Sequence, residues 1–434
     1  MVAGQLSTMG MNTVDVVLAG HLGATVLGAV AVGTALFHLA NIAAIGVNAA
    51  LSPSVAQLDG ARRRDAVGPL FGQGLLIAGA LGLVLAAAVC WLAPLLTTLL
   101  GFAPSLAGPA RDFLRGVAPA LPALSLFYAC RGLSEGLALP LPTMAFGTFG
   151  LLLLIPVGYA LMYGAAGLPA LGAFGAGLAT STVSWAQLGG MVLFLRLSRR
   201  YRGLGWRGAR GLCPDAAAIA GLLRIGAPMA VSMLLESSMF SGAGLAIGTL
   251  GAAAVASHQV ALNVAAFAFM VPLGVALAVT VRVGKAAGRG DAAGVRRAGA
   301  SGFALVLAVQ CVSGGLMLLV PAAIASLYTR DAAVQAGAVV LLRIAGVFQL
   351  SDGLQAVASG ALRGLKDTRM PMLITGVAYW GIGMPLALLL AFGAGWQAPG
   401  MWCGLIAGLS VAAALLSARF FALARRYRRV LAAA

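Results

Sequence analysis

The chain has 434 residues, of which 61% are hydrophobic and only 9% are charged, so a soluble fold could not bury its apolar side chains. Its net charge is +17, but the Lys and Arg residues lie between long apolar runs, which argues against a nucleic-acid-binding protein. Five scattered cysteines with no CxxC or His/Cys cluster argue against a disulfide framework and a zinc site.

Apolar runs of about 18 or more residues, long enough to cross a bilayer as a helix, recur along the whole chain. They predict an all-α integral membrane protein with about 12 transmembrane helices. The predicted spans are 2–20, 27–52, 68–98, 112–134, 141–163, 170–195, 217–243, 252–279, 298–323, 335–360, 370–393 and 399–423.

The basic residues predict the orientation of these spans. All but four of the 28 Lys and Arg residues lie after an even-numbered span, in the middle loop or its flanks, or at the C-terminal end; the four exceptions are Arg111, Arg115, Arg330 and Arg343. Cytoplasmic loops are enriched in Lys and Arg. We therefore expect both termini and the central loop 196–215 to be cytoplasmic, in a multi-pass protein of a bacterial inner (plasma) membrane.

The two halves of the sequence resemble each other at one nearly constant offset. Gly23-Ala24 matches Gly251-Ala252, Gly60 matches Gly288, and Arg131-Gly132-Leu133 matches Arg363-Gly364-Leu365. Two prolines fourteen residues apart occur in both halves, as Pro142 with Pro156 and Pro371 with Pro385.

Matches that keep their order predict two parallel six-helix repeats. The predicted division is an N-lobe at 1–195, a linker at 196–215 and a C-lobe at 216–434. Met1 aligns with Met229, so the segment 215–228 has no counterpart, and we expect the native product to begin about 14 or more residues upstream.

Three of the eleven carboxylates, Asp15, Glu236 and Asp352, fall inside apolar spans. The other eight, including Glu135, are assigned to loops or their edges. A carboxylate within the membrane is costly, so it faces the bundle interior or a wet cavity and marks an ion or proton path. Structural hydrogen bonding to a neighbouring helix is the alternative. Oxygen ligands suit Na⁺, and a desolvated carboxylate can also take up a proton.

Polar and aromatic residues accompany the two later carboxylates at helical spacing. Phe348 and Gln355 lie one turn from Asp352, and Phe240 lies one turn after Glu236. Gln259 and Asn263 are one turn apart in the next span. Such a set suits a cavity for organic cations, which pair with carboxylates and stack on aromatic rings. Ordinary packing between helices explains the aromatic residues equally well.

Several motifs together resemble the multidrug and toxic compound extrusion (MATE) family, in its NorM-like branch, over essentially the whole chain. They are Val14-Asp15-Val-Val-Leu-Ala-Gly20, Pro53-Ser-Val-Ala-Gln57, Gly172-Ala-Phe-Gly175-Ala-Gly177-Leu-Ala-Thr180, Glu236-Ser-Ser-Met-Phe240, His258-Gln259-Val-Ala-Leu-Asn263, Thr280-Val-Arg282-Val-Gly284, and Asp352 followed by Gly360-Ala-Leu-Arg363-Gly364.

The resemblance implies twelve helices in two six-helix lobes, and export of cationic and amphipathic drugs and dyes in exchange for sodium ions or protons. Glu236 and Asp352 match the family's C-lobe cation-site carboxylates, which would bind sodium if that is the coupling ion, and Asp15 matches its N-lobe acid. Two departures stand out: Phe348 occupies a position where relatives often carry tyrosine, and Leu154 and Gly158 occupy positions where they often carry asparagine. The N-lobe polar network is thus expected to be depleted.

The sequence therefore predicts a secondary multidrug antiporter working by alternating access, not an enzyme. We expect a monomer that needs no cofactor beyond the coupling ion and binds no nucleic acid. A lipid-precursor flippase of a related fold is the alternative, although Arg343 is the sole basic residue in the middle of a span. A membrane-embedded enzyme is a weaker alternative. The choice between sodium and protons and the physiological substrate stay open.

Overall fold

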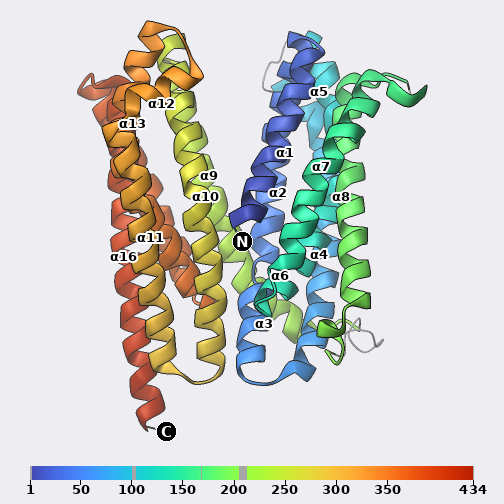
Figure 1. Cartoon of the computed structure of the whole chain (residues 1–434), viewed down its shortest axis with the longest axis vertical. Helices are drawn as coiled ribbons and strands as arrows, with labels where there is room; N and C mark the ends of the chain where they lie inside the picture. The colour runs from blue at the N-terminus through green and yellow to red at the C-terminus, as the bar shows by residue number, and fades with distance from the viewer. Residues whose placement is uncertain (1, 100–103, 168, 205–212, 434) are drawn as a thin grey trace. The chain divides into compact units, whose positions relative to one another are not determined.

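The structure, a computed structural model, is helical along nearly all of the residues that it describes, which are 2–99, 104–167, 169–204 and 213–433 (Figure 1). Contacts divide the chain into two units, Ala3–Ala230 and Val231–Ala434. No β-strand occurs in the described residues. The prediction of an all-α protein is confirmed.

Unit 1 contains eight α-helices and the start of a ninth, with three short 3-10 turns between them in the described residues. The helices are α1 (Val2–His21), α2 (Ala24–Asn48), α3 (Leu51–Gly60), α4 (Val67–Leu99), α5 (Pro104–Val117), α6 (Ala120–Gly136), α7 (Leu141–Tyr163), α8 (Gly172–Leu197) and α9 (Ala216–Gly248), and the turns are η1 (Arg64–Ala66), η2 (Ala165–Gly167) and η3 (Arg199–Tyr201).

Unit 2 begins within α9 and is built around α13, which packs against α10, α11, α12 and α16. Its further elements are α10 (Ala252–Gly288), α11 (Ala292–Leu319), α12 (Pro321–Tyr328), α13 (Ala332–Gly364), α14 (Arg369–Gly376), the π-helical segment η5 (Val377–Gly383), α15 (Met384–Leu388), the π-helical segment η6 (Leu389–Gly393) and α16 (Gln397–Ala433).

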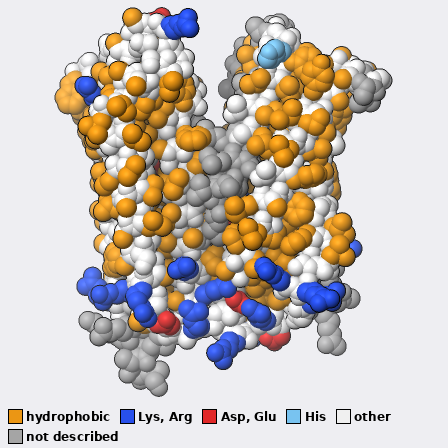
Figure 2. Space-filling model, in the orientation of Figure 1, with side chains coloured by type: hydrophobic (Ala, Val, Ile, Leu, Met, Phe, Trp, Pro, Cys, Tyr) orange, Lys and Arg blue, Asp and Glu red, His pale blue; other side chains and the backbone are white. Residues whose placement is uncertain are grey.

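Ten helices of the described chain are long and apolar enough to cross a membrane, or eleven if the pair α5 and α6, bent by 42°, is counted as one span. The helix α1 coincides with the first predicted span, 2–20, but is not among these crossings. Figure 2 shows a largely apolar surface on each unit, with Lys and Arg side chains gathered at one end of each. The chain is therefore a multi-pass membrane protein.

The internal repeat appears as backbone conformations shared by corresponding positions of the two units. Gly23 and Gly251 precede α2 and α10 with φ of 112° and 104°, values that suit glycine because it lacks a Cβ. The left-handed conformation also recurs at Ala138 and Lys366, with φ of 63° and 60°, after α6 and α13. Each unit therefore places the same turns at corresponding points.

Helix packing repeats in the same register. A Cβ on Gly136 of α6 would lie 2.7 Å from the Ser52 carbonyl oxygen, and a Cβ on Gly364 of α13 would lie 2.7 Å from that of Thr280. These contacts align Gly136 with Gly364, whereas the sequence motifs had aligned Gly132 with Gly364. The motif alignment was therefore one helical turn out of register. Gly132 and Gly136 lie one turn apart on α6 and both approach α3, so either could be matched to Gly364 from the sequence.

The division between the units lies inside α9, after Ala230, and not at the predicted linker. Leu222 and Ile225, in the first half of α9, pack with the hydrophobic cluster of unit 1, and Gly226 approaches the backbone of Val47. The start of the predicted linker also belongs to unit 1, because the buried Tyr201 donates a hydrogen bond to Ser134 (3.1 Å). Residues 205–212 of that linker lie outside the described residues.

Candidate functional site

The two carboxylates predicted in the second half come together in unit 2. Glu236 lies on α9 and Asp352 on α13, and the two side chains interact electrostatically. Asp352 is buried, with only 5% of its surface exposed. Two acids on different helices thus interact, with Asp352 buried and Glu236 partly buried, which is costly unless a cation compensates them.

Arg363 supplies a positive charge to this pair. It lies at the end of α13, eleven residues after Asp352, and interacts electrostatically with Glu236. The sequence had assigned Arg363 to the set of cytoplasmic basic residues. One arginine beside two carboxylates leaves one negative charge when both acids are ionised. The region can therefore accept one further positive charge.

Tyr379 is a member of this group that sequence reasoning missed. It lies in η5, is fully buried, and interacts electrostatically with Glu236, Asp352 and Arg363. The neighbouring Trp380 donates a hydrogen bond to the carbonyl of Leu235 (3.3 Å), which fixes η5 beside α9 next to Glu236. A π-helical segment is uncommon and is often found at functional sites, but its position cannot be read from an apolar sequence.

Two buried oxygens in this group have no hydrogen-bond partner within the described residues. They are Oδ1 of Asp352 and the hydroxyl of Tyr379. Unpartnered buried polar atoms are rare in folded proteins and each needs an explanation. A carboxylate oxygen and a phenol oxygen are ligands that a hard cation accepts, and the carboxylate can equally take up a proton. Their chemistry fits either coupling ion.

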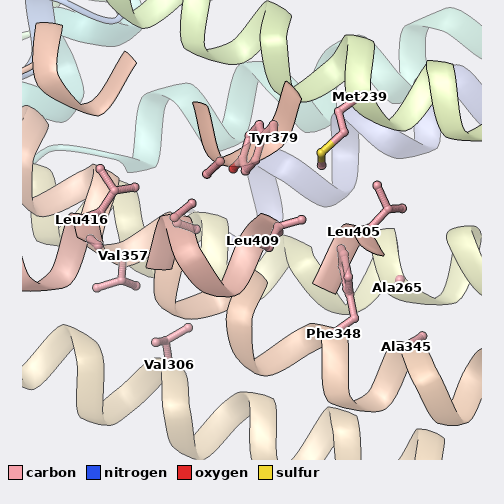
Figure 3. Packing of buried hydrophobic residues seen from close by; sticks show 14 of the residues in the cluster. Met239, Ala265, Val306, Ala345, Phe348, Val357, Tyr379, Leu405, Leu409 and Leu416 are labelled. Carbon is pink, nitrogen blue, oxygen red and sulfur yellow. The ribbon is translucent and has the colours of Figure 1, made fainter. Parts of the chain in front are cut away.

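The aromatic candidates form the apolar side of the same region. The rings of Phe348 and Phe240 lie 6.0 Å apart, and Phe348 lies 5.5 Å from Trp402. Trp402 in turn donates a hydrogen bond to Nδ1 of His258 (3.1 Å). Figure 3 shows Phe348 and Tyr379 among the buried residues of the unit-2 hydrophobic cluster. Phe348 therefore contributes packing here, without the hydroxyl that tyrosine would bring.

The amide candidates divide between a buried and an exposed position. Gln355 is buried in α13, one turn after Asp352. Gln259 and Asn263 lie on an exposed face of α10, where the Asn263 side chain donates to the Gln259 carbonyl (2.9 Å). The structure thus groups Gln355 with α13 and presents the other two amides on the surface of unit 2.

Asp15, the acid predicted in the first half, lines a separate cavity within unit 1. The cavity has a volume of about 110 Å³. Asp15 lies on α1 and accepts a long hydrogen bond from the Thr180 hydroxyl of α8 (3.4 Å). Leu154 is fully buried with Ala179, and Gly158 faces Leu18, so α7 supplies no polar partner at these two positions.

The same cavity has polar walls that the sequence did not reveal. Tyr128 donates to Asn41 (3.0 Å), and Arg131 pairs with Glu135 one turn later on α6 (2.8 Å). Glu135 lies in the last turn of α6, at the edge of a loop as the sequence indicated, but it is only 5% exposed, which the sequence did not show. An Arg and a Glu four residues apart at the end of an apolar span are the signal that could have revealed this pair. The N-lobe polar network has lost the two asparagines but is not apolar.

Comparison with known proteins gives a consistent result. The sequence model of the MatE family matches residues 1–160 and 228–389. The chain is 46% identical over 427 residues to the "Probable multidrug resistance protein NorM" of Xanthomonas campestris pv. campestris, covering 98% of this chain and 93% of that protein. It is 40% identical over 429 residues to the "Multidrug resistance protein PmpM" of Pseudomonas aeruginosa, covering 98% of this chain and 90% of that protein.

The fold also matches solved structures. The crystal structure of the eukaryotic MATE transporter AtDTX14 aligns with a TM-score of 0.87 and 21% sequence identity, over 99% of this chain and 96% of that one. At 21% identity this likeness concerns the fold alone.

Proposed function

This chain belongs to the MatE family of membrane transporters, and on that premise we propose that it is a secondary multidrug antiporter. It exports cationic and amphipathic organic compounds by alternating access, in exchange for sodium ions or protons. Its relatives are named as multidrug resistance proteins and not as enzymes, and an efflux role follows from that membership.

The observation that carries the proposal is the interacting group of Glu236, Asp352, Arg363 and Tyr379 in unit 2, in which Asp352 and Tyr379 are buried. With both acids ionised, the group keeps one negative charge, which is costly in a membrane interior. One sodium ion, one proton or one organic cation would neutralise it. Because only one positive charge is needed, binding of the coupling ion and binding of a cationic substrate oppose each other, as exchange requires.

Separate roles follow for the four residues. Glu236 and Arg363 form the compensated pair, and Asp352, with its unpartnered Oδ1, is the acid that gains and loses the ion. The Tyr379 hydroxyl, which interacts electrostatically with Asp352, is the oxygen that we assign to a bound cation beside that acid. The partly exposed Phe240 offers its ring to an organic cation, and the buried Phe348 packs edge-on against it. Asp15 and its cavity serve as an accessory polar region in the N-lobe.

The proposal is tested by efflux from proteoliposomes holding the purified protein. Export of a fluorescent organic cation should follow an imposed sodium gradient or an imposed proton gradient, measured separately, and should stop when that gradient is collapsed. Liposomes holding the Asp352→Asn protein are the control for leakage. Export that persists with neither gradient, or that requires ATP, would contradict the antiporter proposal.

The orientation with both termini and the linker in the cytoplasm is tested with an introduced cysteine. Gly203 is exposed at the end of unit 1, so Gly203→Cys provides a reactive thiol. The exposed native thiols of Cys90, Cys213 and Cys311 must first be replaced by serine. A membrane-impermeant maleimide should label this protein only after the cells are opened. Rapid labelling of intact cells would reverse the proposed orientation.

A further inference from the structure

A strongly basic pocket lies in unit 2 where α10 ends and α11 begins, and the transport mechanism does not use it. It is open and has a volume of about 390 Å³. Four cationic side chains line it, together with the hydroxyl of Ser301, and the four are Arg282, Lys285, Arg289 and Arg297. Like charges gathered around one concavity repel each other, so an anionic ligand would stabilise the arrangement.

The pocket contains no carboxylate of its own. Asp291 is the one acidic residue in 282–301, and it accepts the Gly294 backbone N–H (2.7 Å) as the N-cap of α11. It is not among the residues that line the pocket. The start of α11 adds the partial positive charge of a helix N-terminus. Arg guanidinium groups are the donors that phosphate oxygens prefer, because they bind two oxygens at once.

The surface of α11 next to the pocket favours a lipid, and not free phosphate, as the anionic ligand. Both α10 and α11 are apolar enough to cross a membrane, so the pocket lies at the end of two spans. Arg297 and Ser301 share one face of α11 with Leu305, Val312 and Leu316. These three apolar side chains are 54%, 66% and 54% exposed. A head group in the pocket would thus continue into an apolar strip able to contact an acyl chain.

The corresponding hairpin of unit 1 lacks this pocket. Ser54 and Gln57 stand at the positions of the first repeat that correspond to Arg282 and Lys285, so neither cation is repeated. There, Arg64 is paired with Asp59 (2.7 Å). The four-cation pocket is therefore not a general consequence of placing basic residues in cytoplasmic loops.

We propose that this pocket binds the phosphate group of an anionic phospholipid such as phosphatidylglycerol, with the lipid's acyl chain along α11. Basic pockets between membrane helices are known to recognise anionic head groups. The proposal concerns a site distinct from the carboxylate group and does not depend on the transported substrate.

The test is native mass spectrometry of the full-length protein in detergent, titrated with phosphatidylglycerol and, separately, with phosphatidylcholine. The wild-type protein should retain phosphatidylglycerol in preference to phosphatidylcholine. The double variant Arg289→Gln, Arg297→Gln should bind phosphatidylglycerol about 30-fold more weakly, since each Lys or Arg adds attraction at an anionic surface. The matched control Arg63→Gln, Arg296→Gln removes two exposed charges outside the pocket and should bind as the wild type does.

Two further outcomes would overturn the proposal. If the double variant and its control lost equal affinity for phosphatidylglycerol, the lipid would be attracted by the protein's net charge alone and not by the pocket. Inorganic phosphate that displaces phosphatidylglycerol at equal concentration would show a site for free phosphate and not for lipid. Size-exclusion profiles and melting temperatures in the absence of lipid distinguish lost binding from lost folding, and Arg289→Gln alone provides a milder variant if the double variant fails to fold.

Discussion

The two units share one scaffold but arrange their buried charges differently. In unit 1, Arg131 and Glu135 neutralise each other one turn apart on a single helix. In unit 2, the position of Glu135 is taken by Arg363, its counterpart in the second repeat, which interacts with an acid from another helix. A pair within one helix is complete as soon as that helix forms. A pair that joins α9 and α13 depends on how these helices pack, so it can respond to bound ions.

A second contrast concerns space. The paired prolines align α7 with the segment from α14 to η6, which makes Gly150 the counterpart of Tyr379. Beside Gly150, Gln187 lines the unit-1 cavity, and its amide donates to the Phe146 carbonyl (3.0 Å). At the corresponding position unit 2 has a buried phenol. The glycine-to-tyrosine difference is therefore one of the differences between the polar cavity of unit 1 and the charged group of unit 2.

The largest expected effect comes from neutralising the unit-2 acids. Glu236→Gln and Asp352→Asn keep side-chain size and remove charge, and each should lower gradient-driven efflux about 100-fold, because breaking a buried charge pair costs about 3 kcal/mol or more. Initial efflux rates in proteoliposomes at matched protein content measure this. Asp331→Asn, at the exposed start of α13, is the control. Wild-type rates in both acid variants would contradict the assignment.

The shared scaffold should respond equally in both units. Gly136→Ala and Gly364→Ala each place a Cβ 2.7 Å from a carbonyl oxygen of the facing helix, so each should destabilise the protein by about 1–3 kcal/mol. Melting temperature in detergent measures the loss. Gly221→Ala and Gly315→Ala add a methyl group where no atom lies within 4 Å, and they should be neutral or stabilising. A lower melting temperature for only one of the two variants Gly136→Ala and Gly364→Ala would contradict the equivalence of these two positions.

Removing one hydroxyl tests whether Tyr379 belongs to the coupling group. Tyr379→Phe keeps the ring in the core and should lower efflux about tenfold, the effect of one hydrogen bond to a charged group. The efflux rate should fall while the melting temperature changes little, because the hydroxyl has no hydrogen-bond partner among the described residues. Tyr163→Phe removes a hydroxyl that donates to the Leu18 carbonyl in unit 1 and is the control. A fall in stability with unchanged efflux would assign Tyr379 to packing.

The smallest effect is expected at the unit-1 acid. Asp15→Asn should lower efflux by less than about threefold, because the hydrogen bond that Asp15 accepts from Thr180 is long and weak. The same gradient assay measures it, beside the two unit-2 variants. A dead Asp15→Asn protein with active Glu236→Gln and Asp352→Asn proteins would reverse the ranking and make Asp15 the coupling acid.

The sequence predicted the membrane class from composition along the whole chain, and the repeated halves from motifs that recur in the same order at one offset. It also singled out Glu236 and Asp352, since an acid in an apolar run is conspicuous. Tyr379 was missed because aromatic residues are ordinary in such runs, and its role depends on η5 packing beside α9. The burial of Glu135 was missed for the opposite reason: it stands at a span end, where exposed charges are usual.

The position of the unit boundary inside α9 has a consequence for biosynthesis. Leu222 and Ile225 complete the hydrophobic cluster of unit 1, yet they belong to the helix that opens the second repeat. Since the chain emerges from the ribosome in order, the first unit cannot finish its core until the seventh span has begun to be synthesised. A gene divided at codon 216 would separate unit 1 from part of its own core, whereas one divided after codon 230 would keep that core in one polypeptide.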